Sequence, residues 1–376
     1  MKKGLLVILS LLFSFAGYAN QCSKYWHKEN YKKAFTPCKK VAEQGNAEAQ
    51  YYLAYMYDEG YGTKQDKQKA FYWYTKAAEQ GLANAQYTLA IMYYEGTRIE
   101  QDNQKAFYWF TKSAEQGFAN AQYNLAIMYY KGAGIEQDKQ KTFYWYTKSA
   151  EQGFADAQHN LAVMYYLGEG TELDNQKAFY WYTKAAEQGF AEAQHNLAYM
   201  YDEGDGIEQD KQKAFYLYTK AAEQGLAKAQ HNLAVMYYKE RGTEQDKQKA
   251  FYWYTKSAEQ GFAEAQNNLG TMYGEGEGIE QDKQKALYWF TKAAEQGGAE
   301  AQYNLAVMYY LGEGTELDNQ KALYWFTKAA EQDIAIAQYN LAFMYYEGEG
   351  TLKDKIKAAY WYTKAAGKVM LKHNIV

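Results

Sequence analysis

The sequence is poor in proline and cysteine, with only Pro37 and two cysteines among 376 residues, and it has no excess of basic residues. Lys and Arg number 41 against 45 Asp and Glu, so no surface is expected to attract a phosphate backbone, and nucleic acid is not an expected partner. The mean hydropathy of −0.69 is too polar for a membrane protein of this length. The chain is instead rich in aromatic residues, with 42 tyrosines and 9 tryptophans, which excludes a disordered chain.

The N-terminus has the pattern of a secretory signal peptide. Lys2 and Lys3 precede an apolar run over residues 5–15, and Gly17 and Ala19 supply the small residues of a cleavage site. The apolar run is too short to span a hydrocarbon core of ~30 Å. We predict cleavage after Ala19, which leaves a periplasmic or secreted chain without a transmembrane segment.

Cys22 and Cys38 are the two cysteines of the chain. In an exported protein, two cysteines predict one disulfide, Cys22–Cys38, and its short loop would stabilise the fold by ~3 kcal/mol in the chain-entropy model. Two unpaired thiols are the alternative.

A period of 36 residues, without insertion or deletion, organises most of the chain. The tripeptide Glu-Gln-Gly recurs from Gly45 to Gly297 at this spacing, and the ninth copy has Asp333 in place of the glycine. Tryptophan follows the same period, with Leu217 as the exception, at Trp73, Trp109, Trp145, Trp181, Trp253, Trp289, Trp325 and Trp361. Such a period indicates stacked repeats.

Each 36-residue unit is expected to form two helices separated by a glycine turn. In the first unit, apolar residues at helical spacing around Leu53 form one face of the first helix, and Gly60 ends it. Asp66 is a suitable N-cap for the second helix. The second helix has a single apolar stripe, formed by Ala70, Trp73, Tyr74 and Ala77.

The repeated pattern is A-x-A-Q-x-x-L-A-x-M-Y-x-x-G followed by D-x-x-K-A-x-x-W-Y-x-K-A-A-E-Q-G, and it extends over residues 46–369. This pattern resembles the Sel1-like repeat family, a relative of the tetratricopeptide repeat. The resemblance implies an all-α fold, a right-handed α/α solenoid of about nine helix-turn-helix repeats whose first helices line the concave face. It also implies protein–protein interaction as the usual role.

Residues 20–45 resemble the second half of a repeat, with Pro37 in the tryptophan position and Cys38 in the core tyrosine position. The disulfide would tie this half-repeat to its incoming strand and make it an N-terminal cap. The predicted organisation is a signal peptide over 1–19, the cap over 20–45, nine repeats and a tail over 370–376. The repeats are 46–81, 82–117, 118–153, 154–189, 190–225, 226–261, 262–297, 298–333 and 334–369.

No catalytic motif is found, since G-x-S-x-G, H-E-x-x-H and a Walker loop are all missing from the sequence. Ser113, Ser149 and Ser257 replace a core alanine, and none of them belongs to an S-x-x-K motif. We therefore predict a non-enzymatic protein without a cofactor. Because some cysteine-rich relatives are linked to penicillin binding or β-lactamase activity, a weak β-lactam-binding or β-lactamase-like activity is kept as an alternative.

Three columns of polar and aromatic residues are expected to line the concave groove, because they lie opposite the Leu53 face of each first helix. The first column is asparagine, at Asn124, Asn160, Asn196, Asn232, Asn268, Asn304 and Asn340. The second holds Tyr123, His159, His195, His231, Tyr303 and Tyr339. The third contains Tyr94, Tyr130, Tyr166, Tyr238, Tyr310 and Tyr346.

Asparagine donates to and accepts from a peptide backbone, and tyrosine offers a rigid face with one hydroxyl. We predict that the groove binds a partner polypeptide and that the protein is monomeric. Two alternatives stay open: a peptidoglycan or glycan ligand, and an asparagine column that only stabilises the repeats. A metal site at the three histidines is disfavoured, because helix axes ~8–10 Å apart hold side chains too far apart for Zn²⁺ at ~2.1 Å.

A further tyrosine recurs in every second helix, and we call this set the B ladder. We expect it on the convex side, partly covered by lysine stems from neighbouring repeats, with a structural use favoured over a docking surface. Its members are Tyr72, Tyr108, Tyr144, Tyr180, Tyr216, Tyr252, Tyr288, Tyr324 and Tyr360.

Overall fold

The structure is a computed structural model that describes residues 17–97 and 99–373, with residues 368–373 described by their backbone alone. Secondary structure within these ranges is helical, without a strand. Most of the predicted signal peptide lies outside the described residues, as do residues 374–376 of the predicted tail. None of the helices in the described part of the chain is long and apolar enough to cross a bilayer.

The chain forms two compact units, divided in sequence between Gln188 and Gly189. In the first unit a helix over residues 17–26 precedes nine helices: α2 (Tyr31–Glu43), α3 (Ala47–Glu59), α4 (Lys67–Glu79), α5 (Ala83–Glu95), α6 (Asn103–Glu115), α7 (Ala119–Lys131), α8 (Lys139–Glu151), α9 (Ala155–Leu167) and α10 (Asn175–Glu187). The second unit contains α11 (Ala191–Glu203), α12 (Lys211–Glu223), α13 (Ala227–Lys239), α14 (Lys247–Glu259), α15 (Ala263–Glu275), α16 (Lys283–Glu295), α17 (Ala299–Leu311), α18 (Asn319–Glu331), α19 (Ala335–Glu347) and α20 (Lys355–His373).

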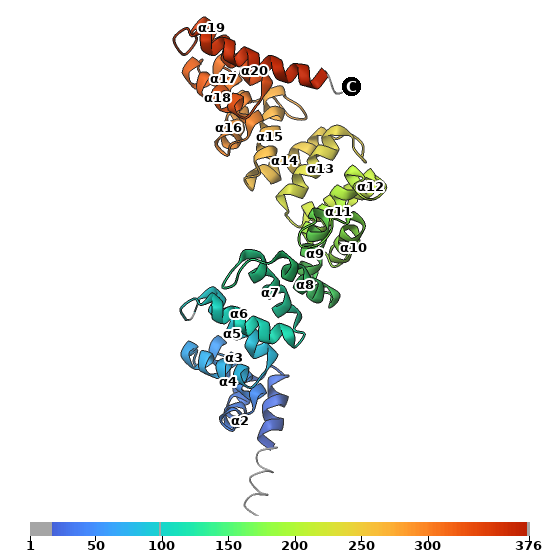
Figure 1. The fold of residues 1–376 in the computed structure, drawn as a ribbon, viewed down its shortest axis with the longest axis vertical. Helices are drawn as coiled ribbons and strands as arrows, with labels where there is room; N and C mark the ends of the chain where they lie inside the picture. The colour runs from blue at the N-terminus through green and yellow to red at the C-terminus, as the bar shows by residue number, and fades with distance from the viewer. Residues whose placement is uncertain (1–16, 98, 374–376) are drawn as a thin grey trace, which may run out of the picture. The chain divides into compact units, whose positions relative to one another are not determined.

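The helices pair into repeats, and we number the repeats 1 to 9 from α3–α4 to α19–α20. The odd-numbered helix of each pair is its helix A, and the even-numbered helix is its helix B. Within each unit, helix B packs against its own helix A and against helix A of the next repeat (Figure 1). The all-α repeat architecture expected from the 36-residue period is confirmed, and α20 continues to His373, into the predicted tail.

Local sequence signals explain where the helices begin and end. The Asp66 carboxylate accepts a hydrogen bond from the Lys69 N–H at 3.0 Å, which caps α4. Gly60 ends α3 with φ +75°, a conformation that costs glycine little. Gly62 has no space for a side chain, because an added Cβ would lie 2.5 Å from the Tyr31 carbonyl oxygen of the preceding helix. The two loop glycines therefore allow both the turn and the close stacking.

The core lies between the two helices of each repeat and between successive repeats. Leu53 and Met56 of α3 are fully buried, as are Ala70 and Tyr74 of α4. The tryptophan predicted in the same stripe is only half-buried. Trp109, for example, packs against the core clusters on both sides of it, so this large ring joins neighbouring repeats rather than filling the centre of one.

Within each unit, a buried glutamine of helix A bonds to the helix B that precedes it. The Gln122 side-chain N–H donates to the Ala114 carbonyl of the preceding helix B at 3.1 Å. Its carbonyl oxygen accepts from the Gln152 side chain of its own helix B at 2.8 Å. Both bonds recur in the same geometry at Gln50, Gln86, Gln158, Gln230, Gln266 and Gln302.

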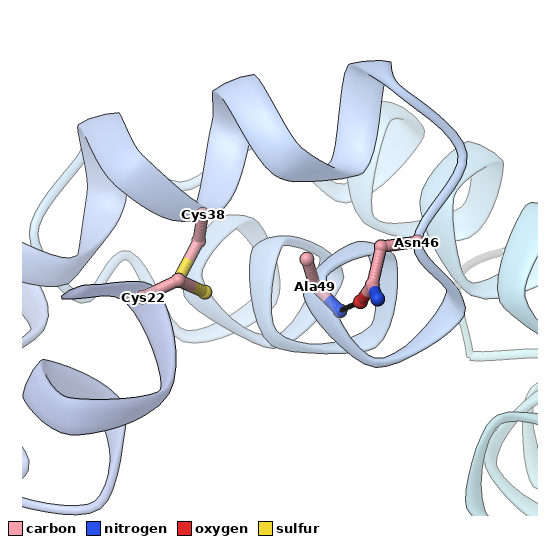
Figure 2. Close-up of a disulfide and its surroundings, with 4 residues drawn as sticks. All are labelled: Cys22, Cys38, Asn46 and Ala49. Carbon is pink, nitrogen blue, oxygen red and sulfur yellow. Dashed lines mark hydrogen bonds between the residues drawn. A yellow bond between two sulfur atoms is a disulfide. The ribbon is translucent and has the colours of Figure 1, made fainter. Parts of the chain in front are cut away.

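The N-terminal cap contains the predicted disulfide between Cys22 and Cys38, with an S–S distance of 2.03 Å (Figure 2). The segment that carries Cys22 was expected to be an incoming strand, and this expectation is wrong. Residues 17–26 are helical, because the cap keeps the two-helix form of the repeats that stack on it. Asn46 then caps α3 by accepting from the Ala49 N–H at 2.8 Å (Figure 2).

Candidate functional site

The side of each helix A opposite its core face offers the candidate binding surface. In the first repeat it is formed by positions 48, 51, 52, 55, 58 and 59, and we call this surface and its equivalents in the other repeats the A face. Exposure at position 58 differs between repeats, since Asp58 and Asp202 are buried there and Tyr130 and Tyr346 are exposed. The A face of each unit is described by itself. The A face includes all three predicted columns.

The tyrosine and histidine column is half-buried, because its rings pack against the core aromatic of their own helix B. The Tyr123 and Tyr146 ring centroids are 5.7 Å apart, and those of His231 and Tyr254 are also 5.7 Å apart. Tyr339, in the last repeat, is the one member predicted for the groove that is mainly exposed. The column thus presents ring edges to solvent while it supports the repeat.

The asparagine column is hydrogen-bonded within the protein. In the second unit, the Asn232 amide N–H donates to His195 Nε2 at 3.2 Å, and Asn268 makes the same bond to His231 at 3.1 Å. In the first unit, Asn124 donates to the Tyr87 hydroxyl of the preceding repeat at 3.5 Å and to the Asn120 carbonyl of its own helix at 3.0 Å. These amides therefore stabilise the contacts between repeats, in addition to any role toward a partner.

His231 is held in its neutral form by these bonds. Its Nδ1 faces the Asn232 side-chain oxygen at 3.1 Å and must donate to it, so its Nε2 accepts from Asn268. Burial lowers the pKa of His231 from its usual value, Lys239 lowers it further, and the Asn232 hydrogen bond and Glu264 oppose the shift. Within the described ranges, no three His, Cys, Asp or Glu side chains are close enough to share an ion.

The third column is the most exposed of the three. Tyr130 and Tyr346 are 44% and 48% exposed, and Tyr166 and Tyr310 are half-buried. Tyr238 donates a hydrogen bond to Glu277 of the next repeat, which together with burial raises its pKa to about 12. Its hydroxyl therefore stays protonated at any physiological pH.

A fourth column on the A face was not predicted as part of the site. It holds apolar or aromatic side chains at the position of residue 55, and Tyr199 and Phe343 are exposed there. The signal was present in the sequence, since an outward-facing helix position with recurrent apolar residues is unusual.

Two cavities open on the A face of the second unit. The larger, of about 810 Å³, is lined by A-face residues of α13, α15 and α17 and brings His231, Tyr238 and Asn268 together. The smaller, of about 380 Å³, contains Tyr303, Tyr310, Tyr339, Asn340 and Phe343. Seven of the predicted groove residues thus line two hollows, while the others lie outside them.

The B-ladder tyrosines are exposed as predicted, but the lysine that lies near each ring comes from the same helix. The Tyr72 ring meets the adjacent Trp73 ring edge-on at 5.0 Å, and Lys76 of the same helix lies 5.9 Å from its centroid. The expectation of lysine stems from neighbouring repeats is wrong, because residues four apart on one helix already lie side by side.

The three serines that could have served as nucleophiles lie in the core. Ser113, Ser149 and Ser257 are fully buried, and each donates to the carbonyl of the first residue of its own helix A at 2.8–2.9 Å. A buried hydroxyl that donates to a backbone carbonyl is not available as a nucleophile.

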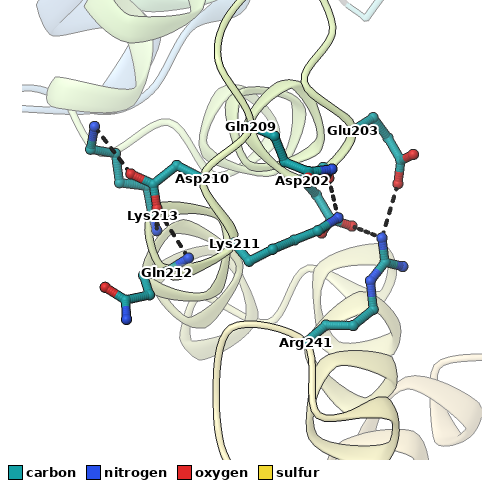
Figure 3. A network of polar contacts seen from close by, with 8 residues as sticks. All are labelled: Asp202, Glu203, Gln209, Asp210, Lys211, Gln212, Lys213 and Arg241. Carbon is teal, nitrogen blue, oxygen red and sulfur yellow. Dashed lines mark hydrogen bonds and ion pairs between the residues drawn. The ribbon is translucent and has the colours of Figure 1, made fainter.

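Ion pairs between repeats lie beside the A face. Lys247 pairs with Glu277 of the next repeat at 2.6 Å, and equivalent pairs join Lys139 to Glu169 and Lys283 to Glu313. In repeat 6, Arg241 takes the place of this glutamate. Lys211 then turns back to Asp202 of its own repeat at 2.8 Å, and Arg241 binds Asp202 and Glu203 (Figure 3).

Stacked two-helix repeats with this core define a helical repeat protein of the solenoid class. The chain belongs to the Sel1 repeat family, whose sequence profile matches residues 47–82, 83–118, 119–154, 155–190, 191–226, 227–262, 263–298, 299–334 and 335–368. Sel1 repeat proteins generally serve as scaffolds that bind other proteins, and this fold is typically non-enzymatic.

Two solved structures are similar over most of the chain. Protein c5321, a protective antigen present in uropathogenic Escherichia coli strains, has an SLR fold and is 37% identical, with a TM-score of 0.88. That match covers 94% of this chain and 76% of c5321. A Sel1 repeat protein from Oxalobacter formigenes is 33% identical over 82% of this chain and 89% of its own, with a TM-score of 0.64. No curated protein sequence matches this chain.

Proposed function

We propose that this protein is a non-enzymatic scaffold of the bacterial cell envelope or the secreted space, and that its A face binds a partner polypeptide. The observation that carries the proposal is the set of exposed aromatic rings on the A faces of the two units; in the second unit, Tyr339 and Phe343 also line the smaller hollow. The exposed rings are Tyr130, Tyr199, Tyr339, Phe343 and Tyr346.

Such a surface is suited to a polypeptide. Exposed aromatic side chains are costly to keep in water without a use, and they bury a large area at a small cost in conformational entropy when a partner covers them. The asparagine column, although bonded between repeats, lies half-buried beside the rings and retains carbonyl oxygens that can accept from a peptide backbone.

A location outside the cytoplasm is supported by two independent features. The Cys22–Cys38 disulfide is typical of proteins that leave the reducing cytosol. The charged and apolar pattern of residues 2–19 is typical of a signal peptide. The description of c5321 as a protective antigen agrees with this location.

The proposal is tested by affinity capture from an envelope extract, with both proteins and muropeptides identified by mass spectrometry. An A-face variant carries Tyr339→Ser, Phe343→Ser and Tyr346→Ser, and a B-ladder variant with Tyr252→Ser, Tyr288→Ser and Tyr324→Ser is the matched control. We expect a specific protein that the A-face variant loses and the control retains. Recovery of muropeptides without protein would instead indicate a glycan-binding module.

A nitrocefin assay with the purified protein tests the enzymatic alternative. We expect turnover no faster than with an inert control protein. A faster rate that depends on the folded protein would contradict a purely non-enzymatic scaffold.

A further inference from the structure

The larger cavity lies where repeat 7 lacks both side chains of a pair that is a ring with a phenylalanine in repeats 2, 3, 4 and 6, and a ring with a leucine or isoleucine in repeats 1, 5 and 8. In repeats 2, 3 and 6 the ring of the tyrosine and histidine column packs on the phenylalanine that precedes the next helix A. The ring centroids are 5.1 Å apart for Tyr87–Phe118 and Tyr123–Phe154, and 5.2 Å apart for His231–Phe262. In repeat 7 this pair is Asn267 and Gly298, so both rings are missing.

Thr271 lies on the same surface, where other repeats have valine, isoleucine, tyrosine or phenylalanine. Together, Asn267, Thr271 and Gly298 line a hollow of about 810 Å³. Ligand pockets are concave sites of about 300–1,000 Å³, so this hollow is of a size that a ligand can occupy.

The charges around this hollow favour a positive ligand. Glu264 and Glu300 line it, are exposed, and have no ion-pair partner among residues 17–97 and 99–373. They are consecutive along the A face of the second unit, where the same position in repeat 6 is Lys228. Lys239 is the one cationic side chain of the lining, and His231 is neutral.

The walls are suited to a long aliphatic stem. Val235, Met272 and Ile334 supply apolar surface, and the lining also includes Tyr254, which belongs with Met272 to the buried core cluster. Arginine buries its carbon stem along apolar surface and keeps its guanidinium near polar groups, and its hydrogen bonds to carboxylates are stronger than neutral ones.

We propose that this cavity, which we call the repeat-7 pocket, binds an arginine side chain of the partner polypeptide. The stem of the arginine lies against Val235 and Ile334, and the guanidinium meets Glu264 and Glu300 at the rim. This inference rests on the proposed function, because the partner reaches the pocket across the A face.

The test uses the full chain and four immobilised nine-residue peptides, Gly-Ser-Tyr-Gly-X-Gly-Tyr-Ser-Gly, with X as arginine, citrulline, norleucine or glutamate. Citrulline has the shape of arginine without its charge. We expect the arginine peptide to bind about three- to tenfold tighter than the citrulline peptide, as ion pairs with two exposed rim carboxylates would provide. Equal binding of these two peptides, or no binding of the arginine peptide at millimolar concentration, overturns the proposal.

Two variants separate the pocket from the rest of the A face. Glu264→Gln with Glu300→Gln is expected to remove the preference for arginine, whereas Glu192→Gln, the same helix position in repeat 5, leaves it intact. Asn267→Tyr with Gly298→Phe restores the ring pair, and is expected to abolish arginine binding while thermal stability is kept or raised. An arginine preference that survives this filling overturns the pocket.

The outcomes also distinguish the two levels of the proposal. If the arginine and citrulline peptides bind equally while the A-face variant still loses its captured protein, the pocket assignment fails and the scaffold function stands. If the A-face variant keeps its captured protein, the proposed function fails as well.

Discussion

Replacing Gln122 with methionine tests how the repeats are held together. Methionine keeps the length of the side chain but removes the amide that donates to the Ala114 carbonyl and accepts from Gln152. Gln122 is only 5% exposed; its bond to the Ala114 carbonyl is buried, and its bond from Gln152 is part-buried. At ~1 kcal/mol for each bond, with a further cost for the polar groups left unpaired, we expect a loss of about 2–3 kcal/mol.

The loss should be local, because each repeat interacts mainly with its neighbours. Hydrogen exchange should therefore accelerate in α6, α7 and α8 and stay unchanged in α3 and α4. Gln152→Met is the matched control, since Gln152 is exposed and loses the shared bond together with a long bond of 3.4 Å to the Lys148 carbonyl of its own helix, at a cost of ~1 kcal/mol. The double variant should show a coupling energy of ~1 kcal/mol. A loss below ~0.5 kcal/mol for Gln122→Met, or faster exchange throughout the unit, would refute the reasoning.

Three further predictions concern the cap, a helix end and a histidine. Cys22→Ser with Cys38→Ser should lower the stability of the cap by ~3 kcal/mol, seen as faster hydrogen exchange in α2, while unchanged exchange would contradict the stabilising role. Glu240→Gly should stabilise the second unit by ~1 kcal/mol in thermal unfolding, because Glu240 has φ +56°, and Gly60→Ala at φ +75° should act in the opposite direction. Because the folded-state pKa of His231 lies below its usual value of 6.5, the unfolded chain binds more protons between these two values, and stability is lost as the pH falls below about 6.5. The protection of the α13 and α15 amides against hydrogen exchange, relative to the intrinsic rate at each pH, should therefore fall as the pH falls below about 6.5. His231→Tyr, which introduces the residue that repeat 3 has at this position, should remove the effect.

The period of 36 residues was enough to predict the helices, their glycine ends and the cap. The spacing of apolar residues within one repeat shows which side of a helix is buried, and Leu53 and Tyr74 are buried as expected. Contacts between repeats could not be predicted in the same way, because they depend on the rotation from one repeat to the next. The half-buried position of the tryptophans and the bond from Gln122 to Ala114 both depend on contacts between repeats.

The candidate site was predicted in part for the same reason. The three columns follow from helical spacing and do lie on the A face. The bonds that join Asn232 and Asn268 to histidines of the preceding repeats required the stacked structure. The repeat-7 pocket could have been noticed by comparing repeats column by column, since Asn267 and Gly298 are departures that are visible in the sequence. That they meet at one hollow is a result of the fold.

Site-specific photocrosslinking in the native envelope tests the central claim, that the A face is where a partner protein binds. A crosslinking amino acid is placed at Tyr130, Tyr199 or Tyr346 on the A face, or at Tyr144, Tyr216 or Tyr360 of the B ladder, which are exposed to a similar extent. We predict crosslinks to one partner protein from A-face positions and none from the B ladder. Crosslinks from the B ladder alone would contradict the account.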